Sequence, residues 1–415
     1  MNKLQSVIAV LTEAVEKIDI TQYGAKGETV LKFTAVFSDI KDFRNPTRIK
    51  YDFNNILCLI FMAIMRSDKS ISCLGIHDHI VVCQDEYKQL GLIENGQIPS
   101  HDTIRRFLML IDPAEMETAL NSHLNDILMK IAALGGSPFT HTSIDGKEVR
   151  GTGRVKTDDR EALRNIQILN IYNNTTAVCV HSETIEDKTN EIPVAQELLK
   201  KMAMKKVVFT FDALHTQRET CSIIHDGKGY YVAPVKDNQR LLYEDLKSRF
   251  NPGRSKPAVF IQNDREFYFL SRPANYSCEG FKGLKTFVKM ISHKKKNEPL
   301  TMYFISNLSI KKADLIMESI ENRWCIENGL HKDKDGFLNE DTVVLTNRTA
   351  VLNIAVINSF AVAAAKLYAI LTREEPRISK KRMKVHPEKV ISFLLSILGD
   401  ERLVEDIASI VKKKS

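Results

Sequence analysis

The sequence predicts a mixed α/β protein in which a helical N-terminal region precedes a sheet flanked by helices. Three observations predict this fold class. From Met1 to about Ala133, apolar residues recur at three- and four-residue spacing, the period of helices that bury one face. After the breaker Gly135–Pro138 the pattern changes to that of strands. Short apolar strands then alternate with helices, as in a sheet continued by crossovers.

The composition is that of a globular protein. The chain has 415 residues, of which 43% are hydrophobic and 27% charged, so it is long enough for two or three domains and too apolar for a disordered chain. Its formal charge of +7 permits a polyanionic partner without demonstrating one. The seven cysteines are scattered and include no Cys-x-x-Cys pair, which favours reduced thiols and a cytoplasmic location.

Neither of the two strongly apolar stretches is expected to cross a membrane. Ile56 to Met65 is too short for a span. Ala350 to Leu371 is long enough, but Asn353, Asn358 and Lys366 interrupt it, so a buried helix is expected. The N-terminus mixes charges into an amphipathic helix and lacks the uninterrupted apolar region of a signal peptide. No membrane partner is therefore predicted.

Residues 1–135 are predicted to form a helical N-terminal domain. The stretch that starts at Pro99 opens with capping residues and places Arg105 and Arg106 in the first turns of a helix. These arginines are compatible with a helix-turn-helix unit that reads DNA, although a solvated helix face is the commoner use of such residues. We therefore predict a DNA-binding role for this domain.

Residues 136–371 are predicted to form an α/β domain. Three consecutive strands are followed by helix, strand, helix and strand, an order that suggests a meander continued by right-handed crossovers. The predicted strands span residues 139–149, 166–172, 177–184, 207–211 and 230–235, and the predicted helices span 191–204 and 216–225.

A β-rich insertion is expected at about residues 250–308, because the alternation of strands and helices is lost there. Its short β-like pieces lie at residues 265–270, 286–292 and 301–305. One continuous helix is predicted next, from Ala313 to His331. Residues 372–415 are predicted to form a separate basic segment that ends in an amphipathic helix.

Three carboxylates lie where a metal-dependent site would need them. Asp145 is mid-strand, Asp212 closes the apolar strand 207–211, and Glu327 is on the predicted helix 313–331. A charged Asp at the end of a buried strand is costly unless it is paired or binds a cation. If the two strands are neighbours and the helix packs across them, the three side chains can share divalent ions that activate attack on a phosphodiester.

These residues, and the polar residues near them, also have ordinary structural interpretations. A single Asp at a strand end is more often a turn or cap residue. For His215, positioning a phosphate or water and capping the next helix are equally expected roles. Asn238 either bonds to DNA or ends a strand. Lys147 and Lys236 can contact phosphate, but solvated lysines are commoner. Trp324 is expected in the core rather than as a stacking platform for a base.

Several blocks of the sequence resemble those of one family. The blocks SIDGKEVRG, FTFDALHTQ, YYVAPVKDNQ and NRWCIENGLHKDKD occur in the family's order between Ser143 and Asp341, together with EDKTNEIP at residues 186–193. They are similar to the DDE transposases of the H-repeat-associated (ISAs-type) insertion sequences. The helical region before them resembles the domain associated with that family.

The resemblance implies an RNase H-like mixed sheet flanked by helices, and a DDE-type transposase that cuts DNA and joins its strands. The family's two aspartates fall on Asp145 and Asp212 and its glutamate on Glu327. They imply a site for two Mg²⁺ ions, with Mn²⁺ as a substitute. The implied partners are DNA, as transposon ends and as target, and further copies of the chain, because transposases work as dimers or larger assemblies.

Basic residues near the glutamate also match a pattern of related transposases. Arg323, Glu327 and Lys334 have the spacing of the Y-R-E-K pattern, whose basic residues contact DNA near the cut. Ile320 replaces the tyrosine, and Lys332 replaces a tryptophan common in the family, so the match is incomplete. The candidate DNA contacts are Arg323, Lys334, His215, Lys147, Lys236 and Asn238. Lysine-rich clusters at residues 282–296 and 380–384 offer a further surface for phosphates.

Two other functions are compatible with these residues. One is a domesticated DNA-binding protein that keeps the fold without transposing, and the other is a metal-dependent nuclease that cuts without joining. The intact carboxylates argue against the first, because a lost activity would leave them free to change.

Overall fold

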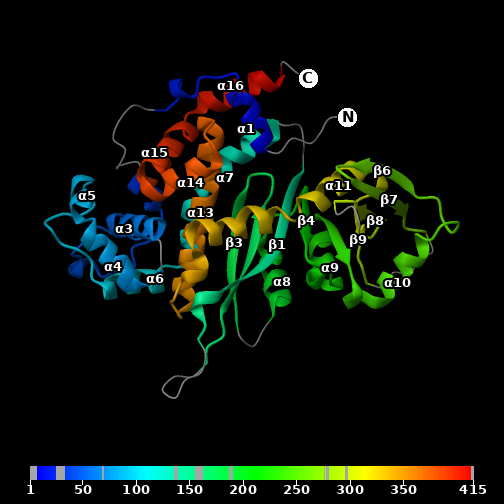
Figure 1. Cartoon of the computed structure of the whole chain (residues 1–415), viewed down its shortest axis with the longest axis horizontal. Coiled ribbons are helices and arrows are strands. Elements are labelled where there is room, and N and C mark those ends of the chain that lie inside the picture. The colour runs from blue at the N-terminus through cyan, green and yellow to red at the C-terminus, as the bar shows by residue number, and fades with distance from the viewer. Residues whose placement is uncertain are drawn as a thin grey trace.

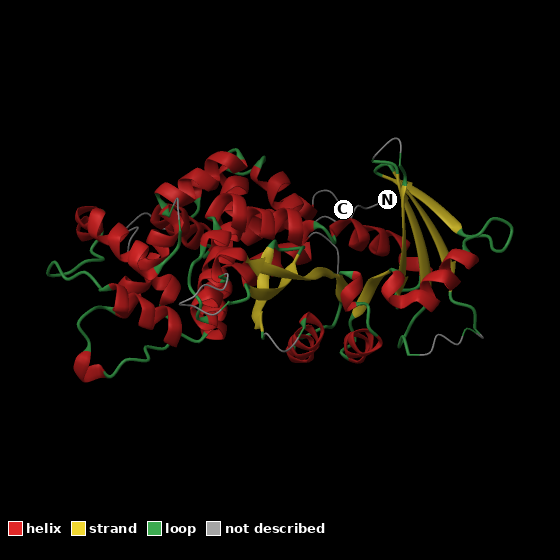
Figure 2. Ribbon diagram, turned by 60° about the horizontal axis from the view of Figure 1, so that its bottom comes forward, coloured by secondary structure: helices red, strands yellow, loops and turns green. Residues whose placement is uncertain are grey.

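The structure is a computed structural model, and it describes residues 7–24, 33–67, 70–134, 139–154, 162–186, 190–274, 276, 280–294 and 298–412. Its two main parts are one large mixed sheet and a helical unit built from both ends of the chain (Figures 1 and 2).

The sheet contains nine strands among the described residues. In chain order they are β1 (Thr140–Val149), β2 (Ile166–Asn173), β3 (Val178–Ile185), β4 (Val207–Phe211), β5 (Tyr230–Val235), β6 (Ala258–Gln262), β7 (Arg265–Ser271), β8 (Thr286–Ser292) and β9 (Leu300–Ser306). Their order across the sheet is β3-β2-β1-β4-β5-β9-β8-β7-β6. The first three strands form an antiparallel meander, and β4 and β5 run parallel to β1. The order and directions of β1 to β5 are those of an RNase H-like core.

The predicted β-rich segment is present, and its strands extend this sheet. Strand β9 pairs antiparallel with β5, and β8, β7 and β6 follow in antiparallel order. Figure 1 shows these strands at the end of the sheet away from the N-terminal helices. Local periodicity identifies a strand and its buried face but does not record which distant strand it pairs with, so the sequence pattern could not reveal this continuity.

Helices cover both faces of the sheet. On one face lie α8 (Glu191–Lys201), α9 (Arg218–Asp226) and α10 (Arg240–Arg249), and on the other lie α7 (Pro113–Leu134), α11 (Ala313–Asn322) and α13 (Arg348–Thr372). Along β4, Phe209 packs in the core beneath α8 and α9, whereas Val208 packs beneath α11. The apolar run of β4 is therefore buried on both faces, as the sequence predicts.

The helical unit combines the two ends of the chain. Its further helices are α1 (Val7–Val15), α3 (Phe53–Arg66), α4 (Cys73–Val82), α5 (Gln84–Gln89), α6 (His101–Leu110), α14 (Pro376–Val385), α15 (Pro387–Leu398) and α16 (Glu401–Lys412). Phe61 of α3 and Phe360 of α13 share one hydrophobic core, with ring centroids 6.3 Å apart. The segment predicted as separate contributes residues from Met383 to Ile407 to this same core.

Within the described part of the chain, α13 is the helix that is long and apolar enough to cross a membrane. However, 83% of its most apolar stretch is buried inside the protein. It contacts α6, α7, α14 and strand β3, so it is the central helix of the helical unit. Residues 56–65, the other apolar stretch, are also buried, in α3.

Candidate active site

The first two predicted carboxylates follow neighbouring parallel strands. In the β1–β4 ladder, Ile144 lies opposite Phe211. The next residue along each strand is Asp145 or Asp212, so the two side chains stand at the same level, at the carboxyl end of β4. Their side chains are 24% and 48% exposed, respectively. The two strands are neighbours, which is the first of the two conditions for the three carboxylates to converge.

Glu327 lies at the start of a π-helical turn, whereas the sequence predicts one continuous helix over residues 313–331. Helix α11 ends at Asn322, a turn follows, and the chain continues as the π-helical turn η8 (Glu327–His331) and then α12 (Lys332–Leu338). Short π-helical turns are frequent at functional sites. This one leaves Glu327 exposed on its surface.

A lysine on the central helix α13 braces this π-helical turn. The ammonium group of Lys366 donates a hydrogen bond to the carbonyl oxygen of Gly329, which lies within η8. Its Nζ atom is also 3.4 Å from the hydroxyl of the buried Tyr172. Lys366, which the sequence suggests only as a polar interruption of an apolar helix, therefore stabilises the backbone that carries Glu327.

Asp145 lies within a cluster of acidic side chains. Burial raises the pKa of Asp145 to about 7, and the negative charges of Glu327, Glu191 and Asp212 add to this increase, while Arg323 opposes it. Asp212 and Glu327 are thus close enough to act electrostatically on Asp145. Such mutual repulsion is relieved by a bound cation.

Glu191, the fourth carboxylate of this cluster, is not among the residues that the sequence singles out. It begins α8 and packs against Gly146, where a Cβ atom would lie 2.3 Å from its Oε1 atom. Its Oε2 atom is 3.2 Å from Nε2 of His215. The block at residues 186–193 contains Glu191 and is the signal that could have identified it.

The donor set fits a hard divalent cation, because carboxylate oxygens are the ligands that Mg²⁺ prefers. The raised pKa of Asp145 also indicates unbalanced negative charge at this point. Within the described ranges, no group of three His, Cys, Asp or Glu side chains is close enough together to hold one ion. The carboxylates are therefore neighbours that have not assembled into a chelating geometry.

Replacing Asp145 by Asn is expected to stabilise the metal-free protein by roughly 2–4 kcal/mol at pH 8. In the folded wild type the pKa is about 7, whereas an unfolded Asp titrates near 4. Between these two pH values the folded state keeps a proton on Asp145 that the unfolded state has lost. The stability of the wild type therefore falls as the pH rises from about 4 to about 7. Urea unfolding in the presence of a metal chelator measures the free energy of unfolding of both proteins. The difference between the variant and the wild type should decrease as the pH falls towards 4. An advantage independent of pH would contradict this explanation.

Two of the predicted DNA-contacting lysines are buried in an ion-pair network, so their amines are not free to contact DNA in this structure. Lys334 is fully buried, with Nζ 3.3 Å from Oε2 of the buried Glu340. Nζ of Lys147 is 3.5 Å from Oε1 of the same carboxylate, and it also pairs with Asp335 at 2.7 Å and Asp341 at 3.2 Å. The network joins β1 to the segment after α12.

The other predicted DNA contacts fall into two groups. His215 is fully buried and contacts Glu191. Asn238 is exposed, and its Nδ2 group donates a hydrogen bond to the carbonyl oxygen of Ala213 at 2.6 Å. Both residues therefore stabilise the loop that follows Asp212. Capping of helix α9, one of the two roles open to His215, is not seen, because the N-cap residue of α9 is Gln217. Lys236 and Arg323 remain near the carboxylates: Nζ of Lys236 is 3.9 Å from Oδ1 of Asp212 and largely exposed.

Trp324, expected in the core, is half-buried instead. Its ring lies beneath the guanidinium group of Arg323, whose Cζ atom is 4.4 Å from the ring centroid. It lines a cavity of about 640 Å³ together with Met290, Leu300 and Asn328. Trp324 lies in the turn between α11 and η8.

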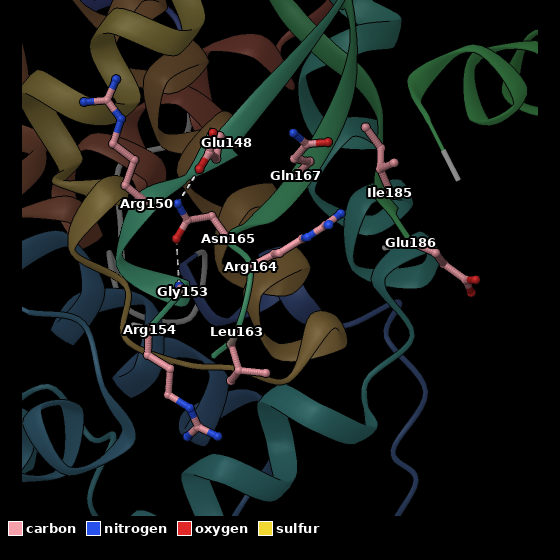
Figure 3. A pocket seen from close by; sticks show the side chains of 10 residues that line it. All are labelled: Glu148, Arg150, Gly153, Arg154, Leu163, Arg164, Asn165, Gln167, Ile185 and Glu186. Atoms are coloured by element: carbon pink, nitrogen blue, oxygen red, sulfur yellow. Dashed lines mark hydrogen bonds between the residues drawn. The ribbon is translucent and has the colours of Figure 1, made fainter. Parts of the chain in front are cut away.

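A second cavity, of about 590 Å³, lies at the far end of β1 and β2 (Figure 3). Asn165 spans it, with its amide group donating to Glu148 and its Oδ1 atom accepting from the Gly153 nitrogen at 2.8 Å. Figure 3 shows the side chains of Arg150 and Arg154 pointing in different directions, so these basic groups do not converge on one anion.

An RNase H-like sheet with acidic side chains at the ends of its central parallel strands defines a class of enzymes that act on nucleic acids. Comparisons with known proteins assign this chain within that class. The model of the transposase DDE domain matches residues 136–362, and that of the DDE-associated domain matches residues 34–124. The chain belongs to the DDE-domain transposase family.

Relatives in bacteria agree with this assignment. YbfL and YhhI of Escherichia coli K12 are 27% and 26% identical to this chain over 328 residues, covering 73% of it and 82% of each relative. YhhI is provisionally named an H repeat-associated transposase. YncI of E. coli O157:H7 is 27% identical over 326 residues, covering 73% of this chain and 79% of YncI. The resemblance to H-repeat-associated transposases is confirmed.

A solved structure, the piggyBac transposase synaptic complex with hairpin DNA, is 15% identical, with a TM-score of 0.38 over 94% of this chain and 79% of that one. Membership of the family makes the chain a DDE-type nuclease and strand transferase that depends on a divalent metal.

Proposed function

We propose that Asp145, Asp212 and Glu327 are the catalytic carboxylates of this transposase and hold two Mg²⁺ ions, which Mn²⁺ can replace. Bound divalent ions would activate the attacking oxygen and stabilise the charge of the leaving one. The juxtaposition of Asp145 and Asp212 on parallel strands supports the proposal, and the effect of Glu327 on the pKa of Asp145 supports including the glutamate.

The proposed reaction has two steps. Water first attacks a phosphodiester at the end of the insertion sequence, forming a new P–O bond and releasing a DNA 3′-hydroxyl. That hydroxyl then attacks a phosphodiester of the target, which releases the target's own 3′-oxygen and joins the strands. With metal activation of the attacking oxygen, no protein general base is required.

Lys236 and Arg323 are the proposed contacts to DNA phosphates near the carboxylates. The helical unit is proposed to bind DNA elsewhere on the substrate, and the protein is proposed to act in the cytoplasm as a homo-oligomer. The division of the chain at residues 135/136 and 371/372 is likewise a proposal. It follows the sequence signals, although packing joins the first and last parts in one core.

Replacing Lys236 by Ala is expected to weaken DNA binding by roughly 3- to 10-fold on every sequence. The slope of log affinity against log salt concentration should become shallower by about the amount that one phosphate contact contributes. The matched control is Lys205→Ala, an exposed lysine just before β4 and therefore at the opposite end of that strand from Asp212. Fluorescence anisotropy across a salt series measures both effects. Equal affinities for the two variants would remove Lys236 from the interface.

A joining assay separates the proposed activity from the alternatives. The wild-type protein, Mg²⁺, a labelled DNA end with a free 3′-hydroxyl and a supercoiled target plasmid are combined. Label transferred to the plasmid is the expected result. Cutting without joining would identify a nuclease, and binding without either reaction would identify a domesticated DNA-binding protein.

A further inference from the structure

His331, the last residue of the π-helical turn η8, lies over a polar row that crosses three strands. Asp145 on β1 is paired with Asn170 on β2, which is paired with Ser182 on β3. Asn170 and Ser182 are buried, and the side chain of His331 is only 12% exposed. Because buried polar groups are costly unless they bond to one another, hydrogen bonds link Ser182 through Asn170 to His331, and the ring of His331 lies beside Asp145.

The contacts of Asn170 determine which atom of its amide faces His331. Its Oδ1 atom accepts a hydrogen bond from Ser182 Oγ at 3.2 Å and lies 3.7 Å from Sγ of Cys179. Its Nδ2 group lies 3.5 Å from the carbonyl oxygen of Ile168, which can only accept, so Nδ2 is also the atom that faces Nε2 of His331, at 3.3 Å. An amide nitrogen only donates, so Nε2 is the acceptor and carries no proton. The imidazole is then neutral, with its proton on Nδ1.

That Nδ1 atom lies 3.5 Å from Oδ2 of Asp145. We propose that Asn170 and His331 orient the Asp145 carboxylate, with the Nδ1–H group of His331 holding Oδ2 so that the other oxygen is presented to a divalent cation. The inference rests on the proposed role of Asp145 as a metal ligand. Groups that orient a ligand in this way typically contribute about 10- to 100-fold to metal affinity. His331 acts through Asp145 and is a positioning residue.

The tautomer of His331 is tested on the full-length protein without metal or DNA. With isotope-labelled histidine, long-range proton–nitrogen NMR spectra report which ring nitrogen carries the proton. We expect Nδ1–H in the wild type, and a shift of the proton to Nε2 in Asn170→Asp, because a carboxylate accepts where the amide donated. A wild-type His331 protonated on Nε2 would overturn the proposal.

Mn²⁺ binding, measured by calorimetric titration without DNA, tests the consequence. His331→Ala and Asn170→Asp are expected to weaken binding by about 10- to 100-fold. His331→Asn should recover most of the loss, since its side-chain NH₂ group can replace Nδ1–H. The control His293→Ala alters a half-exposed histidine paired with Glu266 on β7 and should bind Mn²⁺ as the wild type does.

Asp145→Asn distinguishes failure of this inference from failure of the proposed function. If Asp145→Asn binds Mn²⁺ with wild-type affinity, Asp145 is not a ligand and the proposed function fails. If it loses Mn²⁺ binding while His331→Ala retains it, only the positioning role is overturned. Equal losses in His331→Ala and His331→Asn, accompanied by equal falls in melting temperature, would indicate a purely structural histidine and also overturn it.

Discussion

Replacing Asp145 or Asp212 by Asn, or Glu327 by Gln, is expected to lower the DNA cleavage rate by about a thousandfold or more, a loss of over roughly 4 kcal/mol of transition-state stabilisation. Each amide keeps the size of the side chain but loses the charge that a divalent cation requires. The fold should persist, since all three side chains are partly or fully exposed. Cleavage of a labelled transposon end in Mg²⁺ and in Mn²⁺ measures the effect.

The matched control for these variants is Asp85→Asn. Asp85 is on α5, its side chain is 87% exposed, and it pairs with Lys88 one helical turn away at 3.1 Å. It should cleave at the wild-type rate. If one of the three amide variants cleaves DNA at the wild-type rate, the residue replaced in that variant does not belong to the catalytic site. Retained DNA binding in all variants would confirm that the loss is chemical.

Replacing Lys334 by Met is expected to destabilise the protein by about 3–5 kcal/mol. The substitution leaves the Glu340 carboxylate, which is 1% exposed, without the ammonium group 3.3 Å away. Asn358 on α13 donates to the same carboxylate at 3.0 Å, and Lys147 approaches it at 3.5 Å, so some compensation persists. The free energy of unfolding in urea measures the loss, and Lys334→Met combined with Glu340→Gln should recover part of it.

Lys332→Met provides the comparison for Lys334→Met. Lys332 is on the same helix α12, two residues away, and is exposed, so its replacement should change stability by less than about 0.5 kcal/mol. This pair also separates two interpretations of Lys334. If Lys334→Met unfolds like the wild type but binds DNA weakly, the DNA contact inferred from family resemblance is right, and the buried ion pair opens when DNA binds.

The sequence predicts those features that depend on local patterns. The run from Val207 to Phe211 predicts a strand buried on both faces, and the change of charge at Asp212 marks its end. The convergence of Asp145 and Asp212 then follows once their strands are neighbours. Glu327 is identified by the blocks that resemble the family, not by the helix predicted around it.

The features that the sequence does not reveal depend on distant partners. Lys334 has the composition and spacing of a surface lysine, and only the position of Glu340 against α13 makes it a core residue. Lys366, which donates a hydrogen bond to the π-helical turn at Glu327, comes from a helix that starts after the catalytic segment ends. The block at residues 186–193 contains Glu191, but only the structure shows that Gly146 leaves room for this carboxylate in the acidic cluster.

The sharing of one core by the two ends of the chain affects how the protein forms during translation. The helices before β1 emerge from the ribosome first, yet α13, which fills the middle of their core, is made more than two hundred residues later. Until α13 is made, the apolar surfaces of α3 and α7 that pack against it stay exposed. Nascent chains with exposed apolar surfaces are prone to aggregate. A truncated product that stops before α13 should therefore depend on chaperones and be degraded quickly, so an interrupted gene copy would yield little stable protein.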